Sequence, residues 1–152
     1  MNAMNKIGEG IIAGFVATAV LSMLLLMKSA MGLMPQLDMI SMLSGMMGGG
    51  PAMGWIAHFM IGAVMWGGLF ALLEPNLPGG SLWVRGVLFG IGAWLLMMVA
   101  VMPMAGAGVF GMNLGMAAPI MTLMLHVIYG AVLGGVYAAL QGREQGHQYP
   151  HS

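Results

Sequence analysis

The chain of 152 residues is 60% hydrophobic and only 5% charged, with no net charge and a mean hydropathy of +0.93. Because a soluble domain carries about 25% charged residues, this composition excludes a soluble globular protein and predicts an integral membrane protein. The neutral charge balance gives no support for a nucleic-acid partner. Without cysteine, the chain has no disulfide, thiolate nucleophile or iron–sulfur cluster.

Four apolar stretches follow one another along the chain, and each is long enough to cross a bilayer, which needs about 20 helical residues. We place the spans at about 10–30, 52–73, 83–103 and 119–140. Between the first two, apolar residues recur at helical spacing from Pro35 to Met47, which predicts a short interfacial helix. The polar segment 141–152 is expected to be a loose tail. The predicted fold is all-α, an integral membrane four-helix bundle in a single transmembrane domain.

An internal repeat relates the two halves of the chain. The sequence PAMGWIAHFMIGAVMWGGLFAL, which begins at Pro51, recurs as PIMTLMLHVIYGAVLGGVYAAL from Pro119. The first and third spans match more weakly, through glycines and alanines at corresponding positions. We therefore predict two tandem transmembrane hairpins, from repeats at about 8–73 and 83–140, that insert the same way up. The match also indicates that the first span is retained, although it resembles a cleaved signal peptide.

Basic residues are distributed unevenly between the two sides of this predicted bundle. Lys6, Arg85 and Arg143 fall on one side, and only Lys28 falls on the other. By the positive-inside rule, both termini are expected to be cytoplasmic. At the outer face, Lys28 could pair with Asp38 in the connection that follows the first span.

A histidine occupies the same position in both copies of the repeated span, as His58 and His126. Each follows its proline by seven residues, which predicts that both lie in the outer leaflet. Ionisable residues inside a membrane are costly and usually face the bundle interior or a cavity. A glycine follows four residues later in each copy, as Gly62 and Gly130, on the same helix face. That glycine leaves a gap for a flat ring or for a close neighbouring helix.

Several uses of the histidine pair fit this pattern. Two imidazoles at equal depth could bind haem b, hold copper with help from methionines, or relay protons. They could instead hydrogen-bond a neighbouring helix and serve packing. The candidate site consists of His58, His126, Gly62 and Gly130, with the two histidines as metal ligands. The 21 methionines are spread over the chain and are expected to be mainly apolar filler, although thioethers also suit Cu(I).

Catalytic motifs are absent, since the sequence has no Ser/His/Asp set, no paired carboxylates and no HExxH. The leading hypothesis is a non-enzymatic inner-membrane protein whose histidine pair binds haem b or copper, as an accessory subunit of a membrane complex. One alternative is an oligomeric transporter or channel in which the histidines gate protons or ions. Another is a purely structural protein. Small residues four apart let helices approach closely in the lipid bilayer, within the bundle or in a homo-oligomer.

Three stretches carry a resemblance to a known family: AGFVATAVLSMLLLMKSAMGLMPQLDMI, MGWIAHFMIGAVMWGGLFALL and GVLFGIGAWLLMMVAVMPMAGAGVFG, which cover most of residues 8–140. They resemble the DUF6789-type family of small, four-span bacterial membrane proteins of unknown function. The resemblance implies a retained first span and a location in the bacterial inner membrane. It implies no activity, and it carries over no site residues.

Overall fold

The computed structural model describes residues 2–148, most of which are helical. Four helices are long and apolar enough to cross a membrane, and no strand occurs within residues 2–148. These helices run over Ala3–Ala30, Pro51–Asn76, Leu82–Met104 and Ala117–Arg143. The all-α bundle of four apolar helices is therefore confirmed, and each helix encloses one predicted span.

The first two spans differ in their internal geometry. The first is a single helix, α1 (Ala3–Ala30). The second starts at a proline, which suits a first helical turn because it has no N–H to leave unpaired. It begins as α3 (Pro51–Phe59), widens into the π-helical segment η1 (Met60–Gly67), and ends as α4 (Gly68–Leu73) and η2 (Glu74–Asn76). π-Helical turns are rare and occur frequently at functional sites.

The third span also contains a π-helical segment. It consists of α5 (Leu82–Leu96), the π-helical η3 (Met97–Val101) and the short α6 (Met102–Met104). The fourth span lies within α7 (Ala117–Gln148). This helix continues past position 140, so the segment that the sequence predicts to be a loose tail is helical as far as Gln148. Residues 149–152 of that predicted tail lie outside the described residues.

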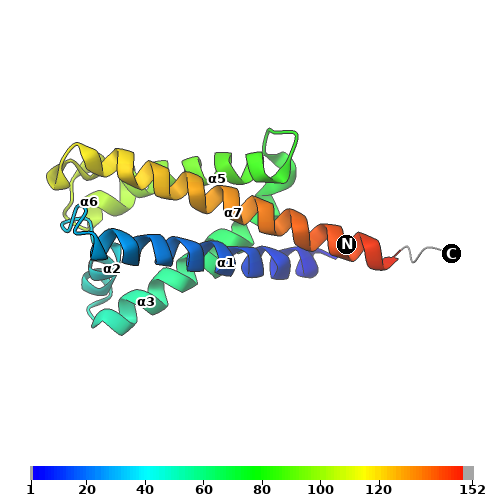
Figure 1. Cartoon of the computed structure of the whole chain (residues 1–152), viewed down its shortest axis with the longest axis horizontal. Coiled ribbons are helices and arrows are strands. Elements are labelled where there is room, and N and C mark those ends of the chain that lie inside the picture. Colours follow the sequence, from blue (N-terminus) through cyan, green and yellow to red (C-terminus); the bar gives the residue numbers. More distant parts are fainter. Residues whose placement is uncertain (1, 149–152) are drawn as a thin grey trace.

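Two short helices, α2 (Met39–Met47) and η4 (Val109–Leu114), lie in the connections after α1 and α6. Both lie at one end of the molecule, which we call the α2 end (Figure 1). The start of α1 and the end of α7 lie together at the opposite end, called the terminal end. The short helix predicted between the first two spans is therefore present. It starts later than Pro35, because the Asp38 side chain caps it by accepting a hydrogen bond from the Ser41 backbone N–H at 3.0 Å.

The four spans pack as two antiparallel hairpins. In the first hairpin α1 packs against η1 and α4, in the second α5 packs against α7, and α1 also packs along α7 to join the two (Figure 1). A shared apolar core lies at this junction and contains Ala13 and Ala17 of α1, Phe70 of α4, Phe89 of α5 and Leu133 of α7. Phe70 contacts Phe89 edge-on, with ring centroids 5.4 Å apart.

Glycines set the close approach of the helices within each hairpin. In the second hairpin, a Cβ on Gly86 would collide with the Gly130 carbonyl oxygen, and a Cβ on Gly130 would collide with the backbone of Gly86. In the first hairpin, Gly10 meets the Gly67 carbonyl oxygen in the same way. Small residues allow such backbone contact between helices in lipid. The two hairpins thus use one mode of packing, as expected for two copies of a repeat.

Lys28 fixes the connection that leads from α1 to α2. Its side chain is buried, and Nζ donates hydrogen bonds to the carbonyl oxygens of Leu33, Met34 and Leu37 at 3.1, 3.0 and 2.8 Å. All three N–H groups of the ammonium are therefore used. The pairing of Lys28 with Asp38 that the sequence suggests does not form as a direct contact, because the carbonyl oxygens are nearer. The Ser41 backbone N–H lowers the pKa of Asp38, and Lys28 adds a smaller effect of the same sign.

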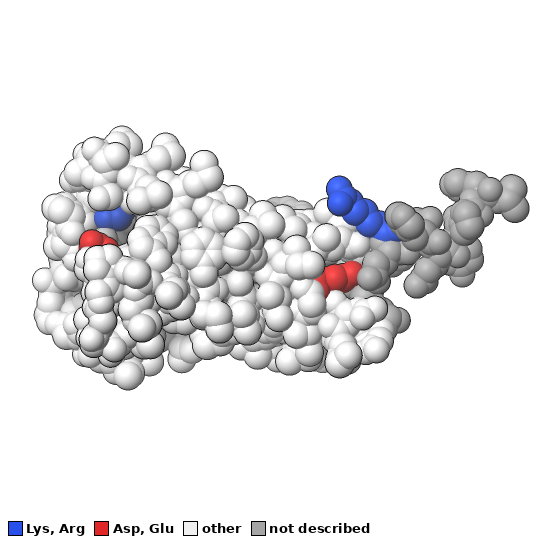
Figure 2. Space-filling model, turned by 90° about the horizontal axis from the view of Figure 1, so that it is seen from below, with Lys and Arg blue, Asp and Glu red and all other residues white. Residues whose placement is uncertain are grey.

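Charged side chains lie at the two ends of the bundle. At the terminal end, Arg85 Nη1 is 2.8 Å from Glu74 Oε2. At the α2 end, Lys28 and Asp38 lie in the connection described above. On the face shown in Figure 2, charged side chains occur at these two ends and the middle has none. This distribution is typical of a protein whose middle lies in hydrocarbon.

Gly130→Ala tests whether the glycine contacts hold the second hairpin together. The added methyl group would overlap the Gly86 carbonyl oxygen, so we expect a loss of about 1–3 kcal/mol in the free energy of unfolding. Gly135→Ala on the same helix is the control, because nothing lies within 4 Å of its Cβ position. Alanine favours a helix over glycine by up to about 1 kcal/mol, so the control should unfold no earlier than the wild type in a denaturant titration. Equal stability of the two variants would contradict this account of the packing.

Candidate functional site

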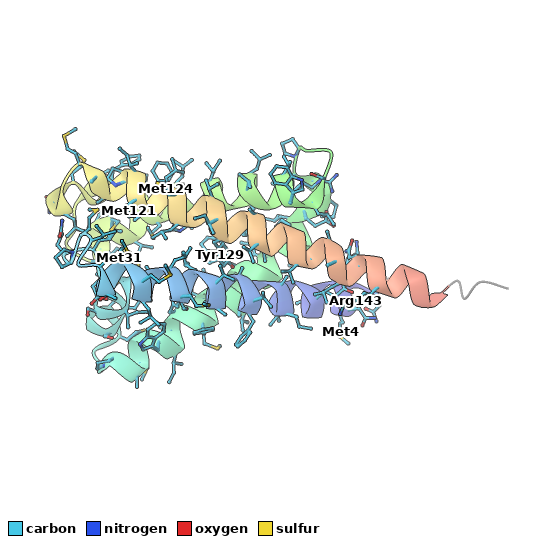
Figure 3. The ribbon with its side chains drawn as sticks, in the orientation of Figure 1. Met4, Met31, Met121, Met124, Tyr129 and Arg143 are labelled. Atoms are coloured by element: carbon cyan, nitrogen blue, oxygen red, sulfur yellow. The ribbon has the colours of Figure 1, made fainter. Side chains whose placement is uncertain are left out.

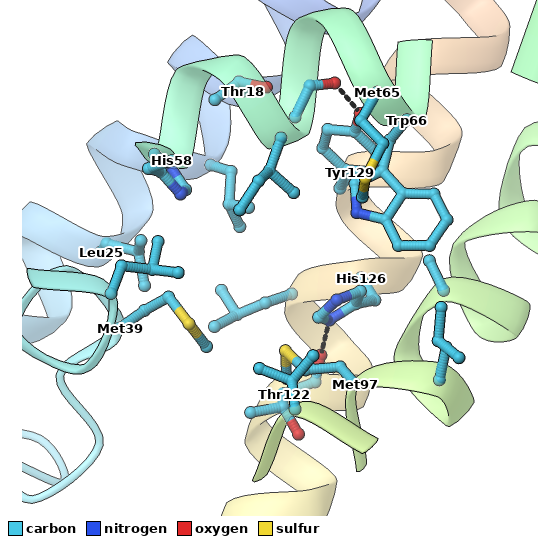
Figure 4. Close-up of a pocket in the computed structure, with 18 of the residues that line it drawn as sticks. Thr18, Leu25, Met39, His58, Met65, Trp66, Met97, Thr122, His126 and Tyr129 are labelled. Atoms are coloured by element: carbon cyan, nitrogen blue, oxygen red, sulfur yellow. Dashed lines mark hydrogen bonds between the residues drawn. The ribbon is translucent and has the colours of Figure 1, made fainter. Parts of the chain in front are cut away.

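A cavity of about 240 Å³ lies between the two hairpins towards the α2 end. Both repeats contribute to its wall, through α1, α3, η1, α5, η3 and α7, and α2 with the residues before it closes one side. His58 and His126 both line this cavity, from α3 and α7 respectively (Figure 4). The fold therefore brings the two sequence-predicted histidines to one space. Most of the remaining lining is apolar.

A backbone hydrogen bond orients His126. Its Nδ1 lies 2.7 Å from the Thr122 carbonyl oxygen, one turn earlier on α7. A carbonyl oxygen only accepts, so Nδ1 carries the proton and donates it. In the neutral ring, Nε2 then carries a lone pair. The side chain is half-buried, and it lines the cavity together with Thr122.

His58 is held by a side chain of the neighbouring helix. Its Nε2 lies 3.1 Å from the Ser22 hydroxyl oxygen of α1. That hydroxyl donates its single hydrogen to the Thr18 carbonyl oxygen at 2.7 Å, so in the neutral ring His58 Nε2 carries the proton and donates to Ser22. Trp55 and Phe59 also contact the imidazole edge-on, at centroid distances of 5.9 and 5.7 Å. His58 is thus more tightly enclosed than His126, and the proton is on a different ring nitrogen.

The two imidazoles lie on opposite sides of the cavity (Figure 4). Each has one ring nitrogen fixed by a hydrogen bond, His58 through Nε2 and His126 through Nδ1. Each fixed nitrogen points to a protein partner, so only the second nitrogen of each ring can serve a ligand. The arrangement suits a ligand placed between the walls, with His126 Nε2 and His58 Nδ1 as the ring nitrogens left for it.

The two glycines predicted beside the histidines serve helix contact. A Cβ on Gly62 would collide with the Thr18 hydroxyl of α1, so that side chain fills the predicted gap. Gly130 faces the Gly86 backbone of α5 in the same manner. Of the two uses that the sequence leaves open, close contact with a neighbouring helix is the one that the structure adopts at both positions. Gly62 also lines the cavity.

Tyr129 is a site residue that sequence reasoning missed. It is buried, and its hydroxyl donates a hydrogen bond to the Gly62 carbonyl oxygen within the π-helical segment η1. Figure 3 shows its side chain between α7 and the first hairpin. The repeat contained a signal, because Tyr129 is a polar residue in a span where the other copy has Ile61. Buried tyrosine hydroxyls usually find a partner, so this difference predicts a hydrogen bond but not its acceptor.

Three methionines line the cavity beside the histidines. Met39 comes from α2, Met65 from η1 and Met97 from η3, and Figure 4 shows all three side chains around the space. No aspartate or glutamate lines the cavity. Within the described part of the chain, no group of three or more His, Cys, Asp or Glu residues is placed to hold a metal ion. The donors available here are therefore imidazole nitrogens and thioether sulfurs.

The fold and the site together define a class of protein: a helical protein with four candidate membrane spans, built from two hairpins around a histidine-lined cavity. A comparison with known families agrees. The chain matches the sequence profile described as "Family of unknown function (DUF6789)" over residues 4–148, and it belongs to that family. The resemblance noted in the sequence is thereby confirmed. No curated protein matches the chain, and no solved structure does.

Tyr129→Phe tests the link between α7 and the π-helical segment. Loss of the hydroxyl leaves the Gly62 carbonyl oxygen without this donor, and such bonds between membrane helices contribute about 0.6–1.7 kcal/mol. We expect a loss of that size in the free energy of unfolding. Tyr137→Phe is the matched control, since the buried Tyr137 hydroxyl on the same helix makes no hydrogen bond to another helix among the described residues. A control that loses as much stability as Tyr129→Phe would contradict the role given to the bond.

Proposed function

We propose that this protein is a non-enzymatic membrane protein that binds a small ligand in the cavity between its hairpins, through His126 and, on the opposite wall, His58. One observation carries this proposal. The histidine of each repeat reaches the same cavity, and each ring has one nitrogen fixed by a protein group. Ionisable residues inside a membrane are functional by default, because burying them without a role is costly.

The surroundings of the cavity support a binding role. Ligand sites in helical bundles are mostly apolar spaces with a few placed polar groups, and this cavity has that character. Two π-helical segments, η1 and η3, contribute residues to its wall. Such segments occur frequently at functional sites, because the extra residue per turn changes where side chains point.

The size of the cavity favours a ligand smaller than haem. Pockets for drug-sized molecules have volumes of about 300–1,000 Å³, and this cavity has about 240 Å³. A haem held by both histidines would also need a free nitrogen from each ring at the iron. His58 uses Nε2 for Ser22 and His126 uses Nδ1 for Thr122, so such a haem would have to take Nδ1 of His58 and Nε2 of His126. A compact ligand is within the size of this cavity.

We also propose in which membrane the protein lies and how it assembles there. The protein resides in a bacterial inner membrane with both termini in the cytoplasm. The α2 end then lies on the outer side of the membrane, and the cavity lies in the outer leaflet. The positions of Lys6, Arg85 and Arg143 on one side support this orientation. The start of α1 and the end of α7 lie at the same end of the molecule, as that orientation requires (Figure 1). We further propose that the protein works as an accessory subunit of a membrane complex or as a homo-oligomer.

His126→Ala is the direct test of the proposed site. The protein is purified from membranes in mild detergent, and its bound species are identified by absorbance spectrum, elemental analysis and mass spectrometry of an organic extract. We expect a ligand in the wild type, and an affinity at least about 10–100-fold lower in His126→Ala. Met124→Ala is the control, because Met124 is exposed on the same helix (Figure 3).

Ser22→Ala tests the role of His58 independently. It removes the hydroxyl that orients His58 while leaving both imidazoles in place. Loss of an orienting partner typically costs about 10–100-fold in metal affinity, so a smaller effect than that of His126→Ala is expected. A wild-type protein without any bound species, whose affinity for added ligands is unchanged in both variants, would overturn the proposed function.

A further inference from the structure

We infer that the ligand of this cavity is a Cu(I) ion, held by His126 Nε2 and by thioether sulfurs of the methionines that line the cavity, Met39, Met65 and Met97. This inference rests on the proposed function and names the ligand of the same site.

The donors around the cavity select a soft metal. Thioethers and imidazoles suit Cu(I), whereas carboxylate and carbonyl oxygens suit Mg²⁺, Ca²⁺ and Mn²⁺. The cavity has two imidazoles and three thioethers on its wall and no carboxylate. Zn²⁺ commonly takes cysteine, histidine or carboxylate ligands, and no cluster of three such residues occurs among the side chains that the structure describes. Cu(I) is the common biological ion that this donor set fits.

The charge of the ion is the second constraint. The cost of moving an ion into a medium of low dielectric rises with the square of its charge, so a divalent ion costs about four times as much as a monovalent one. No anionic side chain lines the cavity to offset that cost. A monovalent ion with neutral ligands is therefore favoured over Cu(II) or Zn²⁺, which would enter with two uncompensated charges.

The orientation of His126 supports its role as a ligand. Histidines that bind metals almost always donate their other ring N–H to a carboxylate, a backbone carbonyl or water. His126 Nδ1 donates to the Thr122 carbonyl oxygen at 2.7 Å, which fixes the ring and leaves Nε2 for the metal. Met97 lines the same cavity from η3 (Figure 4). This hydrogen bond therefore orients the imidazole with Nε2 left for the metal.

Lys28 positions the segment that brings Met39 to the cavity. Its three hydrogen bonds to the carbonyl oxygens of Leu33, Met34 and Leu37 hold the chain up to the residue before the Asp38 cap. Leu37 is buried, and both it and Met39 line the cavity. A lysine whose only role was to contact lipid headgroups would not need all three of its N–H groups bonded to backbone carbonyl oxygens.

Further methionines surround the cavity on the side of the α2 end. Those in and next to the two connections are well exposed, namely Met31, Met46, Met47, Met104, Met112 and Met116. The connection at the terminal end, residues 74–81, has no methionine. Exposed methionines at the ends of the spans and beyond them are not needed as core filler. Their thioethers offer weak soft sites along the route by which Cu(I) would reach the cavity.

The test is an anaerobic titration of the purified full chain in detergent with Cu(I), against a chromophoric Cu(I) chelator. We expect one Cu(I) per chain, no comparable binding of Zn²⁺, and binding of Ag(I) as a second soft monovalent ion. His126→Ala should lower the Cu(I) affinity by about 100-fold or more, at or beyond the upper end of the range for orienting partners. X-ray absorption at the copper edge should show both nitrogen and sulfur neighbours.

Methionine variants distinguish a Cu(I) site in the cavity from Cu(I) binding to methionines on the surface. Met97→Leu nearly preserves volume, so the fold is kept, and we expect the Cu(I) affinity to fall by about tenfold or more. Met124→Leu is the matched control because Met124 is exposed on α7 and does not line the cavity. Lys28→Met should lower the affinity in the wild-type background and have little further effect in Met39→Leu, whereas a merely structural lysine would act equally in both.

The outcomes distinguish this inference from the proposed function. Cu(I) binding that is unchanged in His126→Ala and Met97→Leu would place copper on the surface methionines and overturn the inference. A haem or organic molecule that is lost in His126→Ala, together with no cavity binding of Cu(I), would also overturn it but leave the proposed function standing. If the binding of neither copper nor any other species depends on His126, both this inference and the proposed function are wrong.

Discussion

Backbone contact at glycine is the constraint on which the rest of this structure depends. Helices in lipid gain little from apolar burial, because the solvent they leave is itself apolar, so close packing must hold them together. Gly10 against Gly67, and Gly86 against Gly130, provide that contact in the two hairpins. Both contacts lie away from the α2 end. Where the glycine contacts stop, α3 diverges from α1 (Figure 1), and the cavity lies in the space that remains.

The α2 end is closed by polar contacts, which suit a region near water. Lys28 holds the connection through three backbone carbonyl oxygens, and Gln36 Nε2 donates to the Leu114 carbonyl oxygen of the other repeat at 3.1 Å. These bonds place Leu37 and Met39 against the cavity. The hairpins pack tightly, and the connections form the part of the cavity wall that can differ between the repeats. A ligand reaching the cavity from the α2 end would have to pass these connections.

Sequence reasoning located the spans, the repeat and the histidines, because apolar length and matching residues are local signals. It could not locate the π-helical segments η1 and η3, since they depend on how neighbouring helices pack and not on a residue pattern. The filling of the Gly62 gap by Thr18 was hidden for the same reason, because the partner lies on another helix. Likewise, methionines spread along the sequence gave no cluster, yet Met39, Met65 and Met97 meet at one cavity.

The two copies of the repeat differ at the neighbours of their histidines. His58 meets Ser22 of the first span, and the corresponding position in the third span is Met98. His126 therefore has no hydroxyl from that position, and it turns Nδ1 to its own helix. A perfect repeat would give two equivalent imidazoles, both engaged or both available. With a thioether in place of the hydroxyl, His58 is anchored to a neighbouring helix through Nε2, whereas His126 is anchored to its own helix through Nδ1 and keeps Nε2 for a ligand. The repeat thus supplies two similar spans that each carry a histidine, and the difference between the copies leaves a different nitrogen free on each ring.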